Sequence, residues 1–109
     1  MELKRVVITG VGTVNPLGNS VQEYWENLKN GVSGAAPITH FDASHFPTRF
    51  ACEIKNFDPL LYIDKKEVRK HDKYTQYAFA SSAQAIEDSQ LDLDTIDGDR
   101  VGVIWGAGI

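Results

Sequence analysis

The chain has 109 residues, of which 42% are hydrophobic and 24% charged, and its net charge is −4 at pH 7. This length allows one domain or part of one, and the acidic balance argues against a general nucleic-acid or anionic-membrane binder. No apolar run approaches the roughly 20 residues of a membrane-spanning helix. We see no signal peptide, and the single cysteine excludes an internal disulfide, so we expect a reducing, cytoplasmic location.

The first apolar run, Val6 to Ile8, is followed by a glycine-rich turn. An unbroken β-branched run predicts a strand that is covered on both faces, as in a parallel sheet. A strand followed by Gly10-x-Gly12 is also the start of a dinucleotide-binding fingerprint. That fingerprint needs a third glycine, where this chain has Asn15, and a helix that begins within the turn. A small nucleotide-binding α/β domain therefore remains a distant alternative.

A helix is predicted from about Val21 to Asn30. Ser20 and Glu23 have the spacing of a capping box, in which the first residue caps the helix and the second returns the bond. Apolar residues around Trp25 recur at helical spacing, and we expect this face to pack against the sheet. Gly31 stands where a left-handed residue ends a helix.

The segment from Arg49 to Lys55 alternates in polarity after a turn-rich excursion over residues 31–47. Alternation predicts a half-exposed strand, antiparallel or at a sheet edge. Phe50, Cys52 and Ile54 share its inward face. We therefore expect Cys52, the only thiol, to be structural, because a reactive thiol needs a cationic neighbour or a helix N-terminus.

Two further helices are predicted. The first, Asp64 to Asp72, is short and charged, with Asp64 as its cap and Glu67 at the capping-box position. The second, Lys73 to Asp88, is dense in alanine and serine. Small residues on several sides let a helix approach its neighbours closely, so we place this helix deep in the fold.

Four basic residues in this region have the spacing of one helix face: Lys66, Arg69, Lys70 and Lys73. Like charges at this spacing each cost a few tenths of a kcal/mol. On an acidic protein, a concentrated cationic face indicates a docking surface for an acidic partner. The alternative is an ordinary solvated face, helped by Glu67 and Asp72, and the residues alone leave both possibilities open.

The last apolar run, Arg100 to Trp105, predicts a second strand that is buried on both faces. Two isolated central strands cannot satisfy their backbone groups or cover their apolar faces. The sequence therefore predicts that residues 1–109 form the first part of one longer domain. No metal site is expected, because His40 and His45, which flank Asp42, match no strong metal-binding spacing.

Several segments carry a family resemblance: Lys4 to Gly10, Pro16 to Asn19, Gly31 to Gly34, Lys55 to Phe57, Ile63 to Glu67, Gln76 to Ala78, and Arg100 to Ile104. With these motifs the chain resembles type II β-ketoacyl-acyl-carrier-protein synthases, the condensing enzymes of the thiolase fold. Asn15 departs from the pattern, which has a small hydroxyl residue there. The resemblance implies an α/β fold, the N-terminal portion of a thiolase-like α/β/α layered fold that is incomplete in this chain.

The resemblance also implies a decarboxylating Claisen condensation in fatty acid elongation. It implies a homodimer with acyl carrier protein as partner, and no cofactor beyond the phosphopantetheine that carries the substrates. The catalytic cysteine and two histidines of the family have no counterpart in residues 1–109, so we assign no catalytic residue here and expect the segment alone to be inactive. A ketosynthase domain, or a chain-length partner, of a polyketide synthase is the alternative.

Two sets of site residues follow from the resemblance. Basic residues at the positions of Lys66, Arg69 and Lys70 contact the acidic helix of acyl carrier protein in the family. The residue at the position of Ile109 lines the end of the acyl pocket, where a branched apolar side chain can limit chain length.

Overall fold

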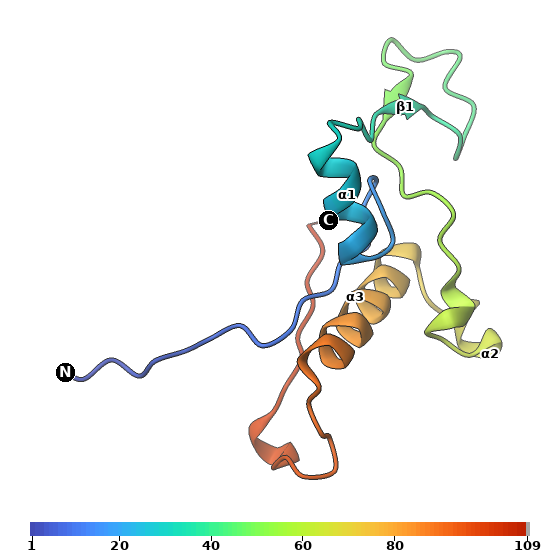
Figure 1. Cartoon of the computed structure of the whole chain (residues 1–109). Coiled ribbons are helices and arrows are strands. Elements are labelled where there is room, and N and C mark those ends of the chain that lie inside the picture. Colours follow the sequence, from blue (N-terminus) through green and yellow to red (C-terminus); the bar gives the residue numbers. More distant parts are fainter. Residues whose placement is uncertain (109) are drawn as a thin grey trace. The chain divides into compact units, whose positions relative to one another are not determined.

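The computed structural model describes residues 1–108, which form two units: Met1–Gly12 together with the chain from Pro59 onward, and Thr13–Asp58. No helix in the described part of the chain has the length and apolar character needed to cross a membrane. The elements in chain order are α1 (Val21–Lys29), β1 (Ala36–Pro37), β2 (Phe50–Ala51), η1 (Pro59–Leu61), α2 (Lys65–Val68), α3 (Lys73–Ser89) and η2 (Gly98–Arg100) (Figure 1).

Helix α1 begins as the sequence predicts, with one difference in the capping box. Ser20 is the N-cap, and its Oγ accepts a hydrogen bond from the Glu23 amide at 3.2 Å. The Glu23 carboxylate accepts in return from the amide of Asn19, at 2.9 Å, rather than from that of the cap. The Ser20 bond satisfies an amide that the first turn leaves open, and the Glu23 bond holds the residue before the cap.

The same helix ends in a Schellman motif. Gly31 has φ +67°, its amide donates to the carbonyl of Leu28, and the amide of Val32 donates to that of Asn27. Both bonds satisfy carbonyls that the helix itself leaves open. A side chain at Gly31 would be strained by the positive φ, which confirms the predicted role of this glycine.

Trp25 does not pack against a sheet as predicted. No residue of α1 is buried, and the Trp25 side chain is 55% exposed. The Lys29 ammonium lies 5.8 Å from the centre of its ring. The physical reason is that the described residues of this unit form only a two-stranded sheet with two residues in each strand.

Strands β1 and β2 pair antiparallel, with Ala36 opposite Ala51 and Pro37 opposite Phe50. The predicted antiparallel strand is thus present but much shorter than residues 49–55. The prediction that Phe50 and Cys52 face inward was wrong, because both are exposed. Alternating polarity indicates which residues share a face, but burial also needs a layer to cover that face.

Asn15, where the resemblance predicts a small hydroxyl residue, still forms a turn. Its backbone exchanges two hydrogen bonds with Gly18, and its Oδ1 accepts from the amide of Leu17 at 2.8 Å. An asparagine oxygen can bond an amide two residues ahead in the same way as a serine or threonine hydroxyl.

Gly10 and Gly12 lie directly against α3, within one unit. A Cβ atom at Gly10 would clash with the carbonyl of Ala85 and lie 2.5 Å from the amide of Ser89. At Gly12 it would clash with the carbonyl of Ser81. Ser81, Ala85 and Ser89 are four residues apart and form one helix face, which confirms that small residues allow a close approach. The two glycines therefore have a packing role that is unrelated to phosphate binding.

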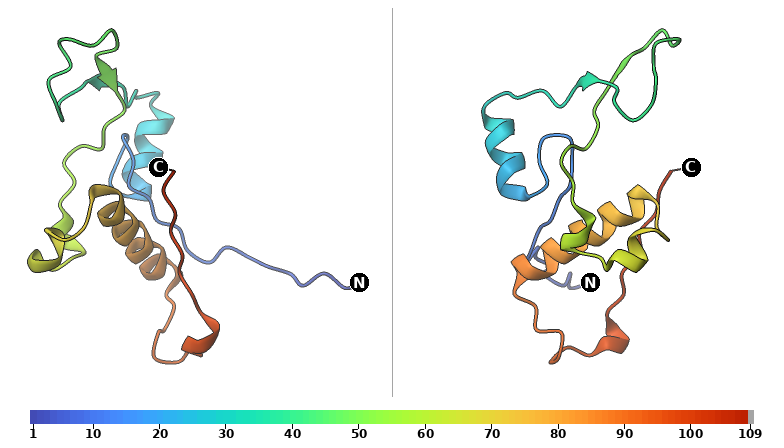
Figure 2. Two further views of the ribbon diagram at one scale, coloured as in Figure 1. Left: turned by 180° about the vertical axis from the view of Figure 1, so that it is seen from behind. Right: turned by 90° about the vertical axis from the view of Figure 1, so that its right-hand side faces the viewer.

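The two apolar runs at 6–8 and 101–105 are extended in every view but form no strand (Figures 1 and 2). Val6 is 88% exposed and Ile104 is 98% exposed. The described residues offer neither run a neighbouring strand or an apolar cover, which is the difficulty that the sequence predicts for two isolated central strands. Trp105 makes a specific contact, in which its Nε1 donates to the Ser82 hydroxyl of α3 at 2.9 Å.

The glycine contact leads to a stability prediction. Gly12→Ala should destabilise the full-length protein by about 1–3 kcal/mol, the usual cost of overpacking. Gly98→Ala is the matched control, since a Cβ atom there meets nothing within 4 Å. Urea unfolding measures both variants, and an equal effect of the two substitutions would contradict the packing role.

Candidate functional site

The candidate site is a basic surface, defined as Lys66, Arg69 and Lys70. Lys66 belongs to α2, Arg69 ends that helix in right-handed helical conformation, and Lys70 lies in the turn before α3. All three residues are exposed. They lie within five consecutive residues of the sequence.

The prediction that these residues share one helix face with Lys73 was wrong. Helix α2 ends at Val68, and Lys73 is the first residue of a separate helix, α3. Between the two helices, Asp72 adopts an extended conformation with φ −65° and ψ 160°. An extended residue interrupts the helical repeat, so spacings counted across it no longer define a common face.

A buried glutamine holds this turn in place. Gln76 is one of the few buried residues, and its Nε2 donates to the carbonyl of Val68 at 3.1 Å and to that of His71 at 2.9 Å. Carbonyls near a helix end lack partners within the helix, and here the next helix supplies a donor. Sequence reasoning missed this role of Gln76; a glutamine between Thr75 and Tyr77 in the first turns of α3 was the signal that could have found it.

The basic surface rests on the best-packed part of its unit. Ala80 is fully buried and Ile63, just before α2, is nearly so. The hydroxyl of Tyr62 accepts from Nε2 of Gln84 at 3.1 Å, which ties η1 to α3. Packing and hydrogen bonds therefore hold the segment that carries the three cations.

Glu67 neutralises only part of this charge. Its carboxylate lies 2.7 Å from Nζ of Lys70 and 3.7 Å from Nε2 of His71. The predicted capping box with Asp64 is not formed, because the Asp64 side chain makes no cap bond. The box prediction was wrong since the Glu67 carboxylate turns toward Lys70 instead.

The remaining cations of the region make no ion pair within residues 1–108: Lys65, Lys66, Arg69 and Lys73. Lys73 is the first residue of α3, where positive charge is unfavourable, and it directly follows the N-cap Asp72, whose negative charge is favourable at that helix end. Ion pairs in the described residues therefore leave most of this cationic charge unpaired.

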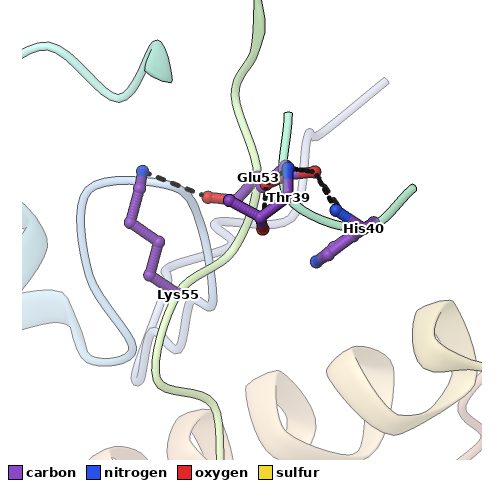
Figure 3. A network of polar contacts seen from close by, with 4 residues as sticks. All are labelled: Thr39, His40, Glu53 and Lys55. Atoms are coloured by element: carbon purple, nitrogen blue, oxygen red, sulfur yellow. Dashed lines mark hydrogen bonds and ion pairs between the residues drawn. The ribbon is translucent and has the colours of Figure 1, made fainter. Parts of the chain in front are cut away.

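The other unit contains a separate polar network, formed by Thr39, His40, Glu53 and Lys55 (Figure 3). The Glu53 carboxylate accepts from the hydroxyl of Thr39 at 2.8 Å and from the amides of Thr39 and His40. These bonds, that of the Thr39 hydroxyl first, hold the pKa of Glu53 below its ordinary value. Nζ of Lys55 donates to the carbonyls of Gly34 and Glu53. The network therefore links the chain near Gly34 to the chain near Glu53.

The structure does not join the two loop histidines into a metal site. His40 faces Glu53, with 3.6 Å between Nδ1 and Oε1. Hydrogen bonds from Ser44, the backbone one first, lower the pKa of Asp42. Within the described residues, no group of three or more histidine, cysteine, aspartate or glutamate side chains is suited to hold a metal ion. Ile109, the predicted acyl-pocket residue, lies outside the described residues.

Residues 3–109 match the family model described as "Beta-ketoacyl synthase, N-terminal domain". The chain therefore belongs to the β-ketoacyl synthase family, and the match is to the N-terminal domain of that family. This assignment confirms the resemblance and the thiolase-like fold class inferred from the sequence.

Individual relatives place the chain more closely within the family. It is 52% identical over all 109 residues to 3-oxoacyl-[acyl-carrier-protein] synthase 2 of Coxiella burnetii and 43% identical to the protein of that name in Synechocystis, and it covers 26% of each. A solved structure, "The ishigamide ketosynthase/chain length factor", is similar with a TM-score of 0.74 and 38% identity. That likeness covers 81% of this chain and 22% of the other. The chain thus spans about a quarter of the length of the curated relatives.

The Glu53 network gives a titration prediction. Hydrogen bonds to the carboxylate favour its charged form, so the pKa of Glu53 lies below 4.5. The network is then intact above that pH and is lost as the pH falls through the lowered pKa. Thr39→Val should raise the midpoint in an NMR titration of the side-chain carbon, whereas Ser44→Ala should affect only Asp42. An unchanged Glu53 midpoint in Thr39→Val would contradict the assignment.

Proposed function

We propose that this chain is the N-terminal part of a condensing enzyme of fatty acid elongation. The observation that carries the proposal is the match over the whole chain to proteins named 3-oxoacyl-[acyl-carrier-protein] synthase 2, at 43–52% identity. The full-length enzyme would join an acyl group to a two-carbon unit from malonyl-acyl carrier protein. Residues 1–109 alone would have no condensing activity.

The reaction proceeds in two steps. A cysteine thiolate outside residues 1–109 attacks the acyl thioester, and the carrier thiol leaves. Malonyl-carrier protein then loses carbon dioxide, and the resulting enolate attacks the acyl-enzyme carbonyl and expels the cysteine thiolate. Two histidines would stabilise the oxyanions that develop in this step, as preorganised donors generally do.

Within this chain, we assign carrier-protein docking to the basic surface of Lys66, Arg69 and Lys70. Three features support the assignment: the side chains are exposed, two of the three have no ion-pair partner in the described structure, and the backbone is held by Gln76. An acidic helix is the complementary partner, because opposite surface charges speed association and orient the complex.

Further parts of the proposal rest on the family alone. The full-length enzyme would be a cytoplasmic homodimer, and it would need no cofactor beyond the phosphopantetheine on its carrier-bound substrates. Ile109 would line the end of the acyl pocket and limit the length of the chain that fits.

A polyketide ketosynthase or chain-length partner is the second candidate. The similar solved structure is titled as a ketosynthase/chain length factor, which favours this alternative. Its identity of 38% is lower than the 43–52% of the fatty acid synthase relatives. We therefore prefer fatty acid elongation.

Charge reversal tests the docking role. In the full-length enzyme, changing Lys66, Arg69 and Lys70 together to Glu should weaken binding of acyl carrier protein roughly ten- to a hundred-fold, because three attractions become repulsions. Turnover of a small acyl thioester that needs no carrier protein should change little. Binding is measured by isothermal titration and turnover by release of the thiol.

Single substitutions provide the matched control. Arg69→Glu should weaken binding more than Lys29→Glu, which makes the same charge change in the other unit at a residue already paired with Glu26. Equal loss of turnover with both substrates would contradict the docking role.

A further inference from the structure

We infer that Glu67 is an internal competitor for the docking partner: it occupies Lys70 until a carboxylate of the acidic carrier protein takes its place. This inference rests on the proposed docking function and names the residue that sets the affinity of that surface. Glu67 would lower affinity for any acidic partner and so favour rapid release.

The geometry places Glu67 inside the basic surface. Its position is between Lys66 and Arg69 in the sequence, and its Oε1 lies 2.7 Å from Nζ of Lys70. Its Oε2 lies 3.7 Å from Nε2 of His71. One carboxylate therefore faces Lys70 and the neighbouring His71, while Lys66 and Arg69 make no ion pair in residues 1–108.

The pair is suited to exchange because it is weak and accessible. The side chain of Lys70 is 65% exposed and that of Glu67 is 44% exposed. Exposed ion pairs three residues apart contribute little to stability, because both partners are well solvated. An approaching carboxylate can therefore replace Glu67 on Lys70 at small cost, but Glu67 then lies unpaired beside an acidic partner.

A substitution at Asp64 serves as the control that distinguishes release of Lys70 from a general loss of negative charge. It is exposed, precedes α2, makes no side-chain cap bond and has no ion pair in the described residues. Asp64→Asn therefore changes the net charge as Glu67→Gln does, without releasing Lys70. Glutamine has nearly the helix propensity of glutamate, so Glu67→Gln should leave α2 intact.

The experiment measures the Kd of acyl carrier protein for the full-length enzyme by isothermal titration. Glu67→Gln should bind about two- to five-fold more tightly, since it removes both a competitor and a repulsion. Asp64→Asn should gain clearly less. In a Lys70→Met background most of the gain from Glu67→Gln should disappear, because there is no longer a cation to release.

Three results would overturn the inference: no gain in Glu67→Gln, an equal gain in Asp64→Asn, or an undiminished gain in the Lys70→Met background. The charge-reversal variant distinguishes failure of the Glu67 inference from failure of the docking function. If reversing the basic surface weakens binding while Glu67→Gln does not tighten it, only the role of Glu67 fails. If the reversal itself has no effect, the docking function fails as well.

Discussion

The contact on which this structure depends is the close approach of the backbone at Gly10 and Gly12 to helix α3. No side-chain atom fits between them, because even a Cβ atom would meet the carbonyls of Ala85 and Ser81. The amide of Val11 adds a hydrogen bond to the Asp88 carboxylate at 2.9 Å. The chain emerging from the first apolar run is thereby fixed along one face of the helix.

Other faces of the same helix organise the rest of the unit. The hydroxyl of Ser82 accepts a hydrogen bond from the indole of Trp105, in the last apolar run. Ala80 is fully buried. Gln76 reaches back to the end of α2 and sets the turn that carries the basic surface. Helix α3 thus connects the two apolar runs to the surface proposed to receive the carrier protein.

Short sequence patterns correctly predicted those features that depend on interactions between residues close in the sequence. Ser20 and Gly31 define the ends of α1, and the density of small residues in α3 predicts its close contacts. The family was also recognisable from motifs spread over the chain, and the match over residues 3–109 confirms it.

Other features depend on contacts that a linear pattern does not encode. The break between α2 and α3 is held by Gln76, several residues further on, so charge spacing alone suggested one continuous face. Burial of Cys52 and Trp25 was predicted from alternation and periodicity, but both require a covering layer that the described residues do not form. Glu67 lies three residues from both Asp64 and Lys70, so the sequence did not show that its carboxylate would pair with Lys70.

We propose, as the central claim, that the two apolar runs, which form no strand in residues 1–108, pair as strands of a sheet in the full-length protein. Amide hydrogen exchange of that protein tests this most directly, since strands paired on both sides exchange slowly. The account predicts that the amides of Val6 to Ile8 and Val101 to Ile104 exchange as slowly as that of Ala80. Exchange as fast as in the acidic loop over residues 91–97 would contradict it.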